Sequence, residues 1–118
     1  MRNELSDAVE SLIHRYATGE RVFTGLELDD ADLSGVNLAG ATFHRCYLSA
    51  TFRGACLRDV VFHECNVKSA DLRDACLRNA SFPGSGVCAI MIDGANLEGA
   101  SFAGAYYHGH EIKEGDFP

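Results

Sequence analysis

The chain has 118 residues, a formal net charge of −7 and 47% hydrophobic residues. This length predicts a single domain, and the acidic balance argues against direct binding of nucleic acid through phosphate contacts. Because the sequence has no run of about 18 apolar residues and its N-terminal segment is polar, we expect no membrane span and no secretory signal, and therefore a cytoplasmic protein.

Residues 4–18 follow a helical pattern. Their apolar residues fall on one face of a helix: Leu5, Ala8, Val9, Leu12, Ile13 and Tyr16. Asn3 or Ser6 can cap the start, and Gly19 can end the helix. We expect residues 1–19 to form an amphipathic helix that covers the first turn of the domain that follows. A membrane-surface or partner-binding helix is the alternative, but the polar face carries Glu4, Asp7 and Glu10 and is not basic.

Residues 20–118 have a period of five. A large apolar residue recurs every fifth position from Phe23 to Phe117, with one step of four between Leu48 and Phe52. The residue two places earlier is usually small, most often alanine. A fixed short period of this kind predicts a solenoid of stacked units rather than a globule with one central core.

A second period of four pentads appears when every fourth centre is compared. The four resulting columns are Phe23, Phe43, Phe62, Phe82, Phe102; Leu28, Leu48, Val67, Val87, Tyr107; Leu33, Phe52, Leu72, Ile92, Ile112; and Leu38, Leu57, Leu77, Leu97, Phe117. The first column is all Phe, which predicts that the backbone closes one turn every four pentads and stacks like on like. The step from Leu48 to Phe52 then marks one corner that is a residue short.

The pentads at 31–35 (AlaAspLeuSerGly), 70–74 (AlaAspLeuArgAsp), 95–99 (AlaAsnLeuGluGly) and 100–104 (AlaSerPheAlaGly) resemble the A(D/N)LXX motif of the pentapeptide-repeat family. The resemblance covers roughly residues 21–117. It implies an all-β fold, a right-handed quadrilateral parallel β-helix of about five coils, here with a short N-terminal α-helix as a cap.

The outer faces of such a rod carry two predicted columns of arginine. Arg53 and Arg73 follow one side, and Arg58 and Arg78 follow the next. We interpret these four residues as a candidate docking patch for a protein partner, with a solvated wall of mixed charge as the alternative. The partner itself stays unknown.

The C-terminal coil has no predicted cap. Tyr106, Tyr107, Ile112 and Phe117 are expected to lie near an open end, where an unpaired edge invites a second copy to stack. We therefore expect a tendency to form homodimers through this end, with a frayed last coil as the alternative.

Histidine and cysteine recur as HisArgCys at 44–46 and HisGluCys at 63–65, which suggests a zinc site. The register argues against it, because Cys46 and Cys65 take the small inward position while His44 and His63 sit at the outer corner. We expect no metal site. Cys56 and Cys76 precede central leucines on adjacent coils and are expected to be free thiols.

No nucleophile–base pair or phosphate-binding loop is apparent, so we expect no catalytic residue and no cofactor. The main functional hypothesis is a non-enzymatic scaffold or protein–protein interaction module. The alternative comes from the family resemblance: some members mimic duplex DNA, bind DNA gyrase and protect it from quinolones. The arginines in the middle of this rod disfavour that alternative.

Overall fold

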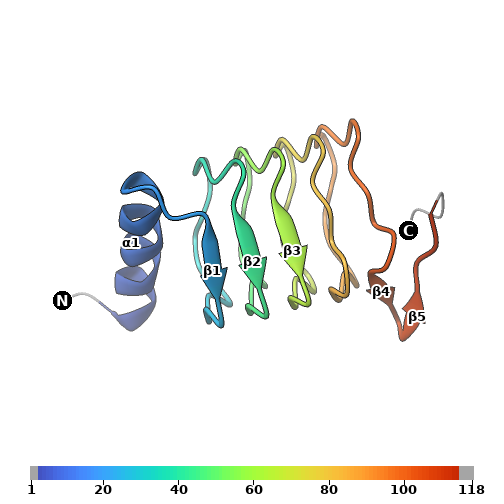
Figure 1. Cartoon of the computed structure of the whole chain (residues 1–118), viewed down its shortest axis with the longest axis horizontal. Helices are drawn as coiled ribbons and strands as arrows, with labels where there is room; N and C mark the ends of the chain where they lie inside the picture. The colour runs from blue at the N-terminus through green and yellow to red at the C-terminus, as the bar shows by residue number, and fades with distance from the viewer. Residues whose placement is uncertain (1–2, 115–118) are drawn as a thin grey trace.

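The computed structural model describes residues 3–114 as a helix followed by a stack of solenoid turns, with overall dimensions of 44 × 25 × 24 Å (Figure 1). Each turn contains 19 or 20 residues and is called a circuit below. Within these residues, no helix has the length and apolar character needed to cross a bilayer. The elements in chain order are α1 (Glu4–Ala17), β1 (Val22–Thr24), β2 (Thr42–His44), β3 (Val61–His63), β4 (Tyr106–Tyr107) and β5 (His110–Glu111).

Helix α1 has a defined signal at each end. The side chain of Asn3 accepts a hydrogen bond of 2.7 Å from the backbone N–H of Ser6, as an N-cap does. At the other end, the N–H of Glu20 donates to the carbonyl of Arg15 and the N–H of Gly19 donates to that of Tyr16. Gly19 has a φ of 110°, so this Schellman-type ending relies on glycine.

The apolar face of α1 packs on the first circuit. Leu12 is buried within the same cluster as Phe23, and the Tyr16 hydroxyl donates to the carbonyl of Ala39 at 2.8 Å. Leu5, Ala8 and Val9 are half-buried against this cluster. The prediction that Ile13 belongs to that face is wrong: 45% of it is exposed, because it lies at the margin of the helix contact.

The predicted register is present in the backbone pairing. Strands β1, β2 and β3 are parallel, and Phe23 pairs with Phe43, then Phe43 with Phe62, in steps of 20 and 19 residues. Parallel bridges outside the strands repeat these steps in further ladders: Glu27–Tyr47–Asn66–Gly86–Tyr106, Asp32–Thr51–Asp71–Met91 and Asn37–Cys56–Cys76–Asn96.

The short corner lies where the sequence predicts it. At ordinary corners an N–H donates to the carbonyl three residues earlier, as Ala31 does to Leu28 at 3.1 Å. At the short corner, the N–H of Ala50 donates to the carbonyl of Leu48, only two residues earlier, at 2.8 Å. The backbone N–H of Ser49 donates to the carboxylate of Asp29, so this N–H has a hydrogen-bond partner although the corner is one residue short.

The core consists of the stacked centres and the small residues between them. The Phe column forms a continuous stack, with neighbouring ring centroids 5.5, 5.7, 4.8 and 4.6 Å apart from Phe23 to Phe102. The leucines and valines of the other columns are buried through Val87, and no buried side-chain nitrogen or oxygen in the described residues lacks a hydrogen-bond partner. The interior is therefore filled.

The prediction that Tyr107 and Ile112 continue the coil is wrong. The chain turns back after Tyr107, and β4 and β5 form an antiparallel hairpin in which Tyr107 pairs with His110 (Figure 1). His108 and Gly109 have φ values of 50° and 79°, as a two-residue type I′ turn requires. In a regular pentad, the residue two places before the centre is small and points inward. His110 occupies that place before Ile112 and is both large and exposed, so the repeat pattern ends here. Phe117 lies outside the described residues.

Candidate functional site

Because the core side chains are buried, the outward side chains are the ones that can contact a ligand or a partner. In the pentads from Phe23 to Val87, the central residue is buried, whereas the two residues that follow the centre are mostly exposed. Any specific chemistry of the coil must therefore be carried by columns of outward side chains from adjacent circuits.

The arginine columns lie in a wall of mixed charge. The N–H of Gly54 donates to the carbonyl of Arg73, and that of Asp59 donates to the carbonyl of Arg78, so the register places each column on neighbouring circuits. Arg53 lies 3.9 Å from Asp74, and Arg78 lies 3.5 Å from Glu98. Both ion pairs are long and exposed, so they offset only part of the positive charge.

Arg73 is the most firmly held of the four. Its Nε and Nη2 donate to the two carboxylate oxygens of Asp71 at 2.9 and 2.7 Å. This bidentate pairing lowers the pKa of Asp71 to about 2, and the N–H of Arg73 donates to the same carboxylate. Among residues 3–114, Arg58 has no carboxylate within ion-pair distance.

The C-terminal residues do not form the expected open coil end. Tyr106 and Tyr107 are 44% and 40% exposed on the hairpin, while Ile112 is buried and reaches the core cluster. Tyr107 also lines a cavity of about 150 Å³ with Val87 and Ile92. The hairpin thus partly covers the last circuit.

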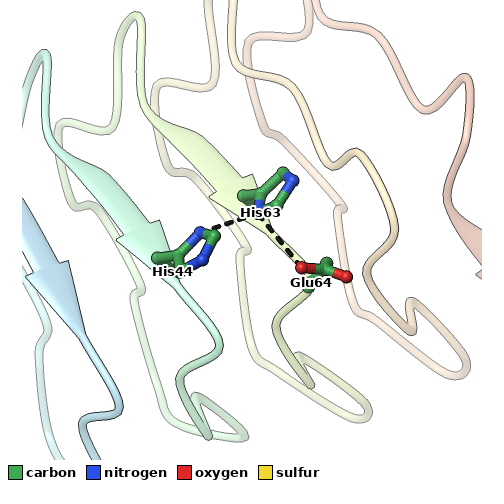
Figure 2. Close-up of side chains that lie close together, drawn as sticks. All are labelled: His44, His63 and Glu64. Atoms are coloured by element: carbon green, nitrogen blue, oxygen red, sulfur yellow. Dashed lines mark hydrogen bonds and ion pairs between the residues drawn. The ribbon is translucent and has the colours of Figure 1, made fainter.

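His44 and His63 lie side by side on β2 and β3, as Figure 2 shows. Their rings stack with centroids 4.5 Å apart and planes 3° from parallel, and their Nδ1 atoms are 2.7 Å apart. Glu64 follows His63, and its Oε1 is 3.5 Å from His63 Nδ1. One potential ligand atom from each of the three residues lies within 4.8 Å of the others.

The two nearby cysteines are separate from this cluster. Cys46 and Cys65 are buried, and their thiols donate to the carbonyls of Phe23 and Phe43 at 3.5 and 3.2 Å. The two side chains also influence each other: the neighbouring Cys65 thiol lowers the pKa of Cys46, and the neighbouring Cys46 thiol raises that of Cys65. The thiols thus occupy the inner side of the wall and the imidazoles the outer side, as the register predicts.

Sequence reasoning missed Glu64. HisArgCys and HisGluCys share their histidine and cysteine, but the residue that differs between them supplies the third polar group beside the histidines. Cys56 and Cys76 are backbone partners in a parallel bridge between neighbouring circuits. Their thiols are free, and both residues are half-buried rather than fully exposed.

Comparisons with known proteins identify the repeat. A family profile described as "Pentapeptide repeats" matches residues 22–51 and 49–84 with eight copies. No curated protein matches the chain. A pentapeptide repeat protein from Nostoc PCC 7120, alr5209, is 32% identical over 92% of this chain and 88% of its own, with a TM-score of 0.45.

Two further solved structures are similar. QnrB1, a plasmid-mediated fluoroquinolone resistance protein, is 23% identical, with a TM-score of 0.56 over 75% of this chain and 46% of its own. A pentapeptide repeat protein of the Arabidopsis thaliana thylakoid lumen is 18% identical, with a TM-score of 0.47 over 76% and 71% of the two chains. Proteins of this kind are generally structural or interaction proteins with a right-handed β-helix-like fold. The chain belongs to the pentapeptide-repeat family.

Proposed function

We propose that this protein is a non-enzymatic scaffold that binds an acidic protein surface through the wall around Arg53, Arg58, Arg73 and Arg78. The observation that carries the proposal is the register, since arginines on adjacent circuits are separated by about one strand spacing of 4.8 Å. Arg58 has no carboxylate within ion-pair distance among residues 3–114, and the side chains of Arg53 and Arg78 are about half exposed.

We also infer a four-sided cross-section with about five coils. Four series of parallel pairings, each at its own position within the 20-residue period, support this shape. The filled interior between Phe23 and Val87 supports a non-enzymatic role, because core side chains occupy the space in which an enclosed substrate pocket would lie.

The docking wall is tested by two charge reversals of equal size. Arg53→Glu with Arg58→Glu should reduce capture of a partner from the native host lysate at least tenfold, because both side chains are exposed. Lys68→Glu with Lys113→Glu changes the net charge by the same amount at exposed sites elsewhere and should leave capture unchanged. Equal capture by both variants would reject the arginine wall.

Mimicry of duplex DNA is the alternative function. The fold resembles QnrB1, a fluoroquinolone resistance protein, and acidic residues gather near the first circuit: Glu27, Asp29, Asp30 and Asp32. The arginine columns, however, interrupt the negative surface that a DNA mimic needs. A gyrase supercoiling assay with and without a quinolone distinguishes the two functions, and protection by this protein would favour the mimic.

We further propose self-association through the C-terminal end. Met91, Asn96 and Ser101 each pair with the preceding circuit only, within the described residues, so a backbone edge there is open to a second copy. Sedimentation at high micromolar concentration tests this, and a purely monomeric mass would exclude it.

A further inference from the structure

We propose that His44, His63 and Glu64 form a binding site for one late first-row divalent transition-metal ion, such as Zn²⁺, on the outer wall of the coil. The juxtaposition is shown in Figure 2: the two imidazoles come from the same position of adjacent strands, and the carboxylate comes from the next residue. The proposal is independent of the docking function.

The parallel ladder holds the two histidines in register. His44 and His63 are Cα partners in β2 and β3, and both are half-buried, which limits the directions in which their rings can turn. The Nδ1–Nδ1 distance of 2.7 Å requires a proton between the two nitrogens or a cation in its place. Nitrogen ligands of tetrahedral Zn²⁺ lie about 3.3 Å apart, so the two Nδ1 atoms need to separate by about 0.6 Å. The rings, now 3° from parallel, also need to turn so that both lone pairs point at one ion.

Glu64 lies at a left-handed corner of the coil. Its φ of 55° is in the left-handed region, as is that of Arg45 on the previous circuit, while the equivalent positions are the glycines Gly25, Gly84 and Gly104. Neither Glu nor Arg is favoured in this region of backbone conformation. At this strained corner, Glu64 Oε1 is 3.5 Å from His63 Nδ1, close to the spacing of two zinc ligands.

The next circuit leaves room for this side chain. A Cβ added at Gly84 would lie 3.0 Å from Glu64 Cγ, so a larger residue at this position would press on the carboxylate arm. Thr24 pairs with His44 on the preceding circuit and offers no nitrogen or carboxylate ligand. The site therefore has three protein ligands and leaves at least one position of the ion open to water.

The donor set selects the class of metal. Two imidazole nitrogens and one carboxylate suit Zn²⁺, Ni²⁺ or Cu²⁺, whereas Mg²⁺ and Ca²⁺ take oxygen ligands. Cys46 and Cys65 donate into the core and do not face the imidazoles. The proposed ligands are therefore two histidines and a glutamate, and no cysteine.

Arg45 opposes the ion electrostatically. Its Nε lies 3.3 Å from Glu64 Oε1, and its side chain is 68% exposed and free to swing away. Removing this competing cation should strengthen metal binding. An exposed ion pair is worth about 0.2–1 kcal/mol, so Arg45→Gln should raise the Zn²⁺ affinity up to about fivefold.

The primary test is calorimetric titration of the full chain with Zn²⁺, with a phosphine reductant and with Mg²⁺ in a parallel arm. We expect one equivalent of Zn²⁺ and no Mg²⁺. His63→Asn and Glu64→Gln should each weaken Zn²⁺ binding by about tenfold or more. Glu64 is exposed, so the Gln variant keeps the fold even where the histidine variant is destabilised.

Two controls locate the site. His108→Asn changes an exposed histidine in the hairpin, where Asn tolerates the φ of 50°, and should not alter binding. Cys46→Ala with Cys65→Ala should also retain Zn²⁺, and the Co²⁺ complex should lack a thiolate-to-cobalt charge-transfer band. Absence of Zn²⁺ binding, unchanged affinity in Glu64→Gln, or loss of binding in the cysteine variant would overturn the proposal.

Discussion

The middle of the coil and its C-terminal circuit carry the same residue types but bury them differently. Leu57 and Leu77 are fully buried, whereas Leu97, at the equivalent position one circuit later, is only half-buried. Ile92 differs from Leu72 in the same way. The middle circuits have a neighbour on both sides and the last one does not, so burial in a solenoid depends on neighbouring circuits as much as on the residue itself.

The two ends of the coil are closed by different means. At the N-terminus, Leu12 of α1 packs against the first circuit. The bounds of this helix are set by local capping residues. At the C-terminus, the backbone folds over itself, and Ile112 both donates to the carbonyl of Ala105 and accepts from the N–H of Gly104. Side-chain packing from the helix thus closes the N-terminal end of the coil, and backbone hydrogen bonds close the C-terminal end.

The sharpest test of the first comparison uses two leucines of one column. Leu57→Ala should lower the free energy of unfolding by about 3 kcal/mol, because it leaves a cavity in a fully packed circuit. Leu97→Ala should lower it by about 1 kcal/mol, since that side chain is already part-exposed. Equilibrium denaturation in urea measures both, and equal losses would contradict the comparison.

The helix cap should matter next. Leu12→Ala should lower the free energy of unfolding by about 2 kcal/mol and accelerate amide exchange in the first circuit, because Leu12 is buried against it. Ile13→Ala is the matched control on the same helix, and with 45% of the residue exposed it should change stability by about 0.5 kcal/mol or less. A larger effect for Ile13 would relocate the helix contact.

The backbone cap is tested at its turn. Gly109→Ala should destabilise the hairpin by about 1–2 kcal/mol, since the φ of 79° is strained for alanine while no atom blocks the added Cβ. Gly109→Asn should cost less, because Asn tolerates this region. Amide exchange at Ile112 reports the opening of the hairpin, and unchanged protection in the alanine variant would show that the turn is not limiting.

The smallest effect is expected from the Asp71–Arg73 pair in the middle circuits. Because the pKa of Asp71 is lowered to about 2 from 3.8, its contribution is present above about pH 4 and is lost as the pH falls towards 2. Asp71→Asn should remove about 1 kcal/mol at neutral pH, after allowance for the partly exposed Arg73, and flatten the acid limb of the stability curve. Asp59→Asn, at an exposed corner, should leave that limb unchanged.

Much of the coil follows from local patterning. The column of Phe residues, the corner that is one residue short and the inward position of Cys46 and Cys65 are all predictable, because inward and outward positions alternate in a fixed way along each pentad. The same register predicts that His44 lies beside His63, although neither the ring stacking nor the 2.7 Å contact can be read from spacing.

The sequence alone determined the repeat, its register and the side chains that fill the core, because these depend on residue size at a fixed period. The tertiary structure decided where the coil ends, since Tyr107 and Ile112 satisfy the apolar period but are drawn into a hairpin by backbone pairing with β5 and Ala105. It also decided that Glu64 joins the histidines, because a left-handed corner directs that side chain and Gly84 leaves space for it.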